Sequence, residues 1–272
     1  AAWRALQDNG QTVPPAVRSL ALAVECFHKA SLIHDDIEDG DPMRYGRPAV
    51  HMEHGVPIAI NVGDALVGEG YRRIAECGAP PDRIAALLSA ATEGHRALCA
   101  GQGEELAWLR APKPIEPRQV LDIFRLKTAP AFEVALRLGT LAAGERSPAV
   151  EAAVREYSAA LGIAYQIRDD LDDLDEPPAD GDSAPRLSIL SALAWETAAG
   201  PQKDRVAQDW CCPREGAAAR IAEFIRCAGI VERARLLLDH HRNAAIRSLE
   251  QVHNVHLKSL LRRIVGRILP RP

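Results

Sequence analysis

Two short stretches of the chain are dense in aspartate, and their residue types and spacing are suited to chemistry. One reads HDDIED and the other, much later in the chain, reads RDDLDD. Asp35 and Asp39 are four residues apart, and Asp169 and Asp173 repeat that spacing. On a helix each pair lies on one face, with Cβ atoms ~5–6 Å apart. Paired carboxylates repel each other and resist burial, so each pair predicts a nearby cation.

An all-oxygen set of ligands favours a hard cation such as Mg²⁺. Mg²⁺ usually keeps several waters and is held by a few carboxylates together with phosphate oxygens. Both clusters end apolar helical sequence, where the helix dipole disfavours carboxylates, so a purely structural role is a poor explanation for them. Two carboxylate faces opposed across a bundle are expected to bind a diphosphate through bridging Mg²⁺. The alternative is that both clusters are solvated helix ends.

Helical periodicity dominates the chain, strand patterns are nearly absent, and aromatic residues make up only 4% of it. No repeat or linker divides the sequence, so we expect one all-α domain over residues 1–272. A polar loop is expected over 175–185. Proline and glycine punctuate helices expected over 15–40, 56–77, 81–108, 117–142, 147–174, 186–200, 216–227 and 229–267.

Composition excludes several classes of protein. The net charge is −4, with acids and bases interspersed, which disfavours a nucleic-acid partner. No apolar run approaches the ~20 residues that span a membrane, and no signal-peptide pattern opens the chain. Six cysteines are scattered without a CxxC spacing, which indicates buried thiols in a reducing cytoplasm. The adjacent Cys211 and Cys212 have no His or Cys at ligand spacing.

Five motifs together resemble a known family. LIHDDIEDGDPMRYGRPAVH, VPIAINVGDAL, GQGEEL, RLKTAPAF and AYQIRDDLDDLD resemble, in order and spacing, the trans-isoprenyl diphosphate synthase (polyprenyl synthetase) family. The resemblance covers about residues 16–175. It implies a helical bundle around a central cavity, in which three Mg²⁺ ions hold an allylic diphosphate. That substrate ionises to an allylic cation, which isopentenyl diphosphate attacks. The resemblance also implies a homodimer packed through the helices after the first motif.

The resemblance assigns roles to residues of this chain that match the motifs. As metal ligands it implies Asp35, Asp39 and Asp169, with Asp36 and Asp173 supporting them or acting through water. It implies that Arg44 and Lys127 neutralise the allylic diphosphate, that Thr128 and Gln166 turn dipoles toward the cation, and that Gln102 lies near the metal. Arg186 is the only basic residue between the second cluster and Lys203, and it is assigned to substrate binding.

The chain departs from the family pattern around the second substrate. Tyr45 stands where the family usually has the second arginine of a pair, and a tyrosine brings no charge. The family's GGK-x-x-R segment, which also binds isopentenyl diphosphate, is not in this sequence. We therefore expect condensation, with an ionisation-only enzyme of the class I terpene synthase type as the alternative. A regulatory subunit without activity is disfavoured, because the aspartates are intact.

Residues on the stretch before the first motif bear on product length. Ser31 and Ala30 are small, so they do not block the cavity one turn below the metal. Phe27 lies ~12 Å below the metal end of the helix, where it would form a floor for a geranylgeranyl diphosphate-like product. The alternative is that Phe27 is ordinary core packing.

Overall fold

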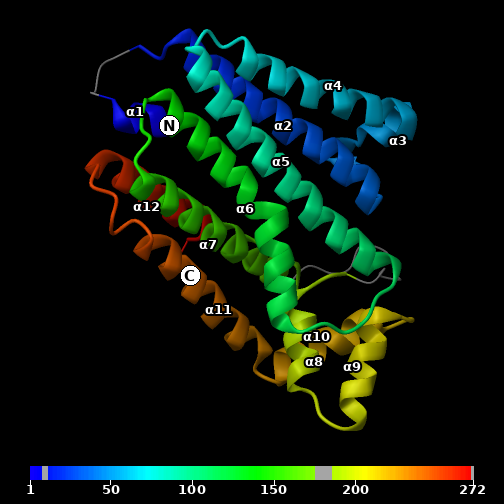
Figure 1. Ribbon diagram of the computed structural model, residues 1–272. Helices are drawn as coiled ribbons and strands as arrows, with labels where there is room; N and C mark the ends of the chain where they lie inside the picture. Colours follow the sequence, from blue (N-terminus) through cyan, green and yellow to red (C-terminus); the bar gives the residue numbers. More distant parts are fainter. Residues whose placement is uncertain (8–11, 175–185, 271–272) are drawn as a thin grey trace. The chain divides into compact units, whose positions relative to one another are not determined.

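The computed structural model describes residues 1–7, 12–174 and 186–270, and helices dominate it (Figure 1). The predicted all-α class is confirmed. The loop expected over 175–185 lies outside the described residues. In chain order the elements are α1 (Ala2–Leu6), α2 (Pro15–Asp39), β1 (Met43–Arg44), β2 (Arg47–Pro48), α3 (Val50–His54), α4 (Val56–Ala75), α5 (Pro81–Arg110), α6 (Pro117–Ala142), α7 (Pro148–Asp173), α8 (Ile189–Thr197), α9 (Pro201–Cys211), α10 (Ala217–Cys227), α11 (Ile230–Arg247) and α12 (Val255–Ile268).

Proline and glycine set many of the helix boundaries. Five helices begin on a proline, at Pro15, Pro81, Pro117, Pro148 and Pro201. Proline is favoured at the first helical position because its missing N–H has no intrahelical partner to lose. These starts explain why the expected helices agree closely with α2, α5, α6 and α7.

The chain divides by its internal contacts into two compact units. Unit 1 contains Ala1–Gly94, Glu133–Glu151 and Asn254–Leu260. Unit 2 contains His95–Phe132, Ala152–His253 and Leu261–Pro272. The first aspartate cluster belongs to unit 1, and the second belongs to unit 2. The prediction of one domain over 1–272 stays a prediction.

Unit 1 is built on the pairing of α2 with α4, which lie side by side in Figure 1. Small buried residues on both helices, including Ala23, Ala30, Ala59 and Gly63, allow the two backbones to approach closely. An apolar core from α2, α4, α5 and α6 extends this contact, with Leu20, Ile74, Leu87 and Leu138 among its buried members.

Unit 2 has a larger apolar core. It draws on the end of α5, on α6 and α7 and on the helices α8 to α11, and it includes Phe124, Ile167, Leu193 and Ile230. Trp108 and Trp210 meet within it with ring centroids 5.6 Å apart. The short helices α8, α9 and α10 contact one another and are grouped together in Figure 1. Ile163 and Ile167 of α7 belong to this core, which therefore fixes the helix that ends in the second acidic cluster.

Several sequence expectations were wrong in detail. The single helix expected over 229–267 is two helices, because the chain turns after Arg247 and the Asn254 side chain accepts from the Leu257 amide 2.8 Å away to start α12. The stretch expected as a helix over 186–200 is helical only as α8, and α9 was not anticipated. The hairpin β1–β2 and the short helices α1 and α3 were also missed.

The expectation of buried thiols was only partly right. All six cysteines are free, but Cys99, Cys212 and Cys227 are exposed. Within the described part of the chain, no helix combines the length and the apolar character needed to cross a membrane.

Candidate active site

The first acidic cluster forms the last turn of α2 and presents its carboxylates differently. Asp39 is exposed, Asp35 is partly buried, and Asp36 is only 3% exposed. Gly40 then ends the helix with φ 69°, and its N–H donates to the Asp36 carbonyl. A left-handed residue of this kind after a helix is usually glycine, because a side chain would strain it. The i, i+4 pair of Asp35 and Asp39 thus remains at the surface of the helix end.

Asp36 has a partner that the sequence did not predict. The Arg44 guanidinium, from β1, donates to Asp36 Oδ1 through Nε at 2.7 Å and also through Nη2. Arg44 Nη2 additionally lies 3.3 Å from Asp41 Oδ2. Arg44 was expected to face the allylic diphosphate and Asp36 to support a metal. The structure pairs these two residues with each other, which fixes the position of the hairpin on α2, and their roles toward diphosphate and metal stay predictions.

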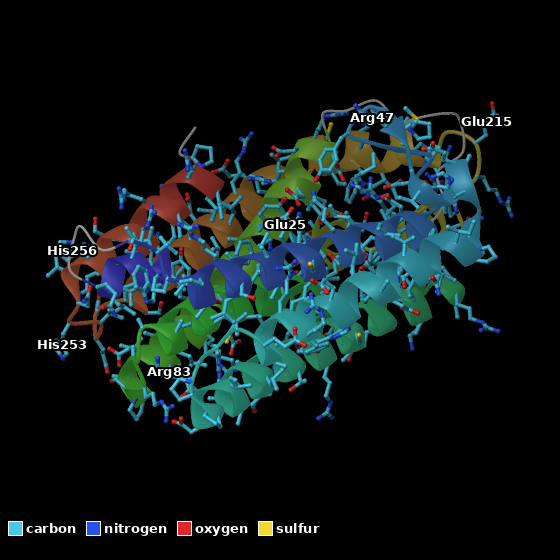
Figure 2. The ribbon with its side chains drawn as sticks, turned by 90° about the horizontal axis from the view of Figure 1, so that it is seen from above. Glu25, Arg47, Arg83, Glu215, His253 and His256 are labelled. Carbon is cyan, nitrogen blue, oxygen red and sulfur yellow. The ribbon has the colours of Figure 1, made fainter. Side chains whose placement is uncertain are left out.

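Tyr45 sits at the tip of that hairpin. The φ of Tyr45 is 52° and the φ of Gly46 is 74°. Positive φ at both central residues is typical of the type I′ turn that joins two paired strands. Within the described ranges Tyr45 is the only residue other than glycine with positive φ, and it is 75% exposed. Lys29 Nζ lies 5.3 Å from the centre of the Tyr45 ring, a cation–π contact back to α2. Figure 2 labels Arg47 on this hairpin and Glu25 one turn before Lys29.

His34, next to Asp35, is packed tightly against α4. Its Nε2 lies 3.6 Å from Asp64 Oδ1, and a Cβ placed on Gly63 would come within 2.2 Å of the same nitrogen. Gly63 therefore has no room for a side chain. The imidazole fills the gap that this glycine leaves, and it fixes the register of α2 against α4 beside the first cluster.

The two residues predicted to control product length differ in their surroundings. The Phe27 ring packs against α4, where a Cβ built on Gly70 would lie 2.5 Å from the ring. The ring centroids of Phe27 and Tyr71 are 5.0 Å apart. Phe27 is partly buried against the core of unit 1. Ser31 is exposed and donates to the His28 carbonyl of its own helix at 2.9 Å.

The second acidic cluster ends α7, and two arginines form ion pairs with its aspartates. Arg168 Nη2 donates to Asp169 Oδ1 at 2.7 Å, and Arg168 Nε lies 3.4 Å from Asp172 Oδ2. Arg186 Nη2 donates to Asp173 Oδ2 at 2.7 Å. Burial raises the pKa of Asp169, and its acidic neighbours raise that pKa further while Arg168 opposes the rise. A cation at this cluster would relieve the same electrostatic cost.

Asp170, to which the motifs assigned no role, anchors the start of α8. Its Oδ2 accepts from the Ile189 backbone N–H at 2.6 Å and from the Ser188 hydroxyl at 3.0 Å. Burial raises the pKa of Asp170 to about 7, while these hydrogen bonds oppose the rise. Trp210 Nε1 donates to the Arg186 carbonyl at 2.9 Å. The start of α8 and its Arg186 are thus held against the second cluster.

Helix α6 presents Lys127 and Thr128 to the same unit. Lys127 Nζ lies 2.6 Å from Glu105 Oε2, and both side chains are largely buried. Gln166 Nε2 donates to Thr128 Oγ1 at 2.9 Å. Gln166 is three residues before Asp169 on α7, so this bond brings the lysine–threonine pair of α6 against the turn that carries the second cluster. Glu105, in the GQGEEL motif, was not recognised as the partner of Lys127.

Gln102 is partly buried on α5, one residue after Gly101. A Cβ on Gly101 would meet the Lys127 backbone nitrogen at 2.5 Å, so this glycine allows α5 and α6 to approach closely. The contact explains the first glycine of the GQGEEL motif. It also places Gln102 and Lys127 on neighbouring helices of unit 2.

The donor set of each unit fits Mg²⁺ only in part. Among the residues that the structure describes, no three His, Cys, Asp or Glu side chains converge on a point where a metal ion would be held. The described residues of the two units therefore form no all-protein cage. Mg²⁺ usually needs only one or two carboxylates, with water and phosphate oxygens completing its shell. Asp35 and Asp39 in unit 1 and Asp169 in unit 2 fit that mode of binding.

Comparisons with known proteins agree with the motifs. The family model described as Polyprenyl synthetase matches residues 1–182. A short chain isoprenyl diphosphate synthase from Methanothermobacter thermautotrophicus is 28% identical over 266 residues, covering 95% of this chain and 81% of the relative. A geranylgeranyl diphosphate synthase from Cereibacter sphaeroides is 32% identical over 235 residues, covering 80% and 76%. The farnesyl diphosphate synthase of Escherichia coli is 34% identical, but the match spans only 53% of that protein.

Solved structures share the fold. A geranylgeranyl pyrophosphate synthetase from Pyrococcus horikoshii superposes with a TM-score of 0.83 at 22% identity, covering 100% of this chain and 84% of that one. A geranylgeranyl pyrophosphate synthase from Corynebacterium glutamicum, solved in complex with isoprenyl diphosphate and magnesium, gives a TM-score of 0.85 at 23% identity, with the same coverage. At these identities the likeness is one of fold.

Proposed function

The chain belongs to the polyprenyl synthetase family, and on that premise we propose that it is a Mg²⁺-dependent prenyltransferase that condenses isopentenyl diphosphate with an allylic diphosphate. The hydrogen bond between Gln166 and Thr128 is the observation that carries the proposal. It joins the lysine–threonine pair to the helix turn of the second acidic cluster, so one unit holds a cation, two polar dipoles and a carboxylate cluster together. A merely solvated acidic helix end would not need that arrangement.

Each group has a distinct task in the proposed reaction. The C–O bond of the allylic diphosphate breaks, the diphosphate leaves with the electron pair, and the double bond of isopentenyl diphosphate forms the new C–C bond before one proton is lost. Lys127 binds the departing diphosphate, since its ammonium has donors to spare beyond the one that Glu105 accepts. The Thr128 and Gln166 oxygens orient partial negative charge toward the allylic cation without the nucleophilicity that would trap it.

Metal ions are part of the proposal. Asp35, Asp39 and Asp169 would hold Mg²⁺, three ions being expected with diphosphate bound, with Asp36 and Asp173 in support. When bound, Mg²⁺ supplies the positive charge that makes diphosphate a good leaving group. Asp36 would act indirectly, because its carboxylate accepts from Arg44. Arg44, Gln102 and Arg186 are proposed to complete the diphosphate surroundings.

The proposed product is geranylgeranyl diphosphate or one of similar length. Ala30 is buried and small, and Phe27 lies further down α2 against Gly70 and Tyr71. An aromatic pair at that depth would stop a growing chain after several isoprene units. The packing of Phe27 on α4 also agrees with an ordinary core role, so a product assay must separate the two.

A homodimer is proposed from the exposed apolar side chains of one segment of unit 1. Large apolar side chains on α3 and the first half of α4 are exposed by 38–58%, and we call them the α3–α4 surface: Met52, Val56, Ile58, Ile60 and Val62. On α4 they lie on two sides of the helix, Val56 with Ile60 and Ile58 with Val62, and monomeric proteins rarely leave so many large apolar side chains uncovered on one segment. A second copy of the chain is the proposed occupant.

An ionisation-only enzyme of the class I terpene synthase type is the second candidate. Tyr45 favours it, because an exposed, uncharged ring occupies the position of the family's second arginine. Purified protein with Mg²⁺ and geranyl or farnesyl diphosphate, with and without isopentenyl diphosphate, separates the two. Condensation predicts a longer diphosphate product only when both substrates are present, whereas diphosphate release from the allylic substrate alone would support the second candidate.

A further inference from the structure

One guanidinium links the C-terminal end of α12 to the second acidic cluster. Arg168 Nη1 donates to the Ile268 carbonyl at 2.6 Å, while Nη2 donates to Asp169 Oδ1 at 2.7 Å. Its Nε lies 3.4 Å from Asp172 Oδ2, and its guanidinium carbon lies 4.6 Å from the centre of the Tyr165 ring. Each of these partners belongs to unit 2.

The contact with Ile268 satisfies a group that a helix cannot satisfy by itself. The last carbonyls of a helix have no intrahelical partner, and a cation there also meets the negative end of the helix dipole. A second side chain of α7 holds α12 further back, since the buried Tyr157 hydroxyl donates to the Leu261 carbonyl at 2.9 Å. Of these two attachments, only Arg168 also contacts the acidic cluster.

Arg168 is a tethered cation. Its side chain is 29% exposed, and it is held by a carbonyl, two carboxylates and an aromatic face. It cannot turn into solvent without giving up the Ile268 contact. Arg168 therefore holds a fixed positive charge against one oxygen of Asp169. A divalent cation that binds this carboxylate must compete with that charge.

We infer that Arg168 competes with divalent metal for Asp169, and that this competition couples metal binding at the second cluster to the docking of the C-terminal end of α12. The inference rests on the proposed function only in taking Asp169 as a metal ligand. Coupling between two sites is reciprocal, so metal must loosen the end of α12 by the factor by which docking weakens metal binding.

The first test measures metal affinity without substrate. Mn²⁺ binding is followed by electron paramagnetic resonance in the full chain carrying Asp35→Asn and Asp39→Asn, so that the second cluster dominates the signal. Adding Arg168→Gln is expected to lower the Kd for Mn²⁺ about three- to tenfold, the range of one partly screened charge pair. Tyr157→Phe, which removes the other attachment of α12, is expected to leave the Kd within about twofold.

The second test follows hydrogen exchange of residues 262–270 by mass spectrometry. Arg168→Gln should speed exchange there without metal, and saturating Mn²⁺ should speed it in the wild type but not in Arg168→Gln. Weaker or unchanged Mn²⁺ binding in Arg168→Gln, or a metal effect on exchange that survives the substitution, overturns the inference. Damage to the fold would lower metal affinity, so the predicted increase has no trivial explanation. Neither the Mn²⁺ affinity nor the hydrogen exchange needs substrate. Both tests therefore remain valid if the protein does not catalyse condensation.

Discussion

Arg44 and Asp36 form an ion pair in which a hairpin arginine neutralises a carboxylate buried on α2. Two nitrogens of Arg44 reach the same oxygen of Asp36, whose side chain is 4% exposed while that of Arg44 is 33% exposed. The pair explains how an aspartate in the middle of a surface cluster can be buried. It also ties the hairpin that carries Tyr45 to the helix that carries Asp35 and Asp39.

Removing the arginine should expose the cost of that burial. Arg44→Ala leaves the Asp36 carboxylate without its counter-charge and is expected to destabilise the protein by about 2–3 kcal/mol. Arg47→Ala, at the exposed residue directly across the hairpin ladder, is the matched control and should change the free energy of unfolding by less than about 0.5 kcal/mol. Urea denaturation measures both, and equal effects would rule out the ion pair as the anchor.

Gly63 should tolerate no side chain. Gly63→Ala would drive a Cβ into the His34 ring beside Asp35, so we expect a loss of roughly 1–3 kcal/mol in stability and a lower kcat. Gly68→Ala is the control on the same helix, because no atom lies within 4 Å of a Cβ built there. That substitution should stabilise the protein by about 0.5–1 kcal/mol. Gly63→Ala behaving like Gly68→Ala would show that His34 does not fix the register.

Phe27 should limit product length. Phe27→Ala removes the ring that packs on Gly70 and Tyr71, and the expected result is a shift to longer prenyl products on chromatography. Phe27→Leu keeps most of the core volume and should shift the product less. If both variants fold and give the wild-type product distribution, Phe27 is core packing and the limit lies elsewhere.

The α3–α4 surface should mediate self-association. Ile58→Glu puts a charge on a side chain that is 53% exposed and should convert the dimer to monomer in analytical ultracentrifugation. Leu236→Glu alters an exposed leucine on α11, 62% exposed, and should leave the oligomeric state unchanged. A monomeric wild type at micromolar concentration would show that this surface does not mediate self-association.

The sequence predicted the long helices well, because periodicity and helix-starting prolines act locally. The start of α6 at Pro117 and its end at Ala142 are examples. The hairpin at Met43–Pro48 was invisible, since strands of two residues carry no alternation. The break between α11 and α12 was missed because helical character continues on both sides, and only the Asn254 cap marks it.

The candidate site was predictable in residue type but not in pairing. Motif order predicted roles for Asp169, Lys127, Thr128 and Gln166, which stay predictions, and unit 2 brings their helices together. The partners of Arg168 were beyond reach, because Ile268 is 100 residues away and a helical pattern carries no information on contacts at that separation. Asp170 was likewise indistinguishable from its neighbours until its burial against α8 was seen.

The stoichiometry of diphosphate release distinguishes condensation from ionisation alone. With radiolabelled isopentenyl diphosphate, farnesyl diphosphate and Mg²⁺, one diphosphate should be released for each isopentenyl unit incorporated. Lys127→Met should lower that rate by at least about 100-fold, because it removes a charge on the leaving group. Diphosphate released from farnesyl diphosphate at the same rate without isopentenyl diphosphate, and with no label in the product, would contradict condensation.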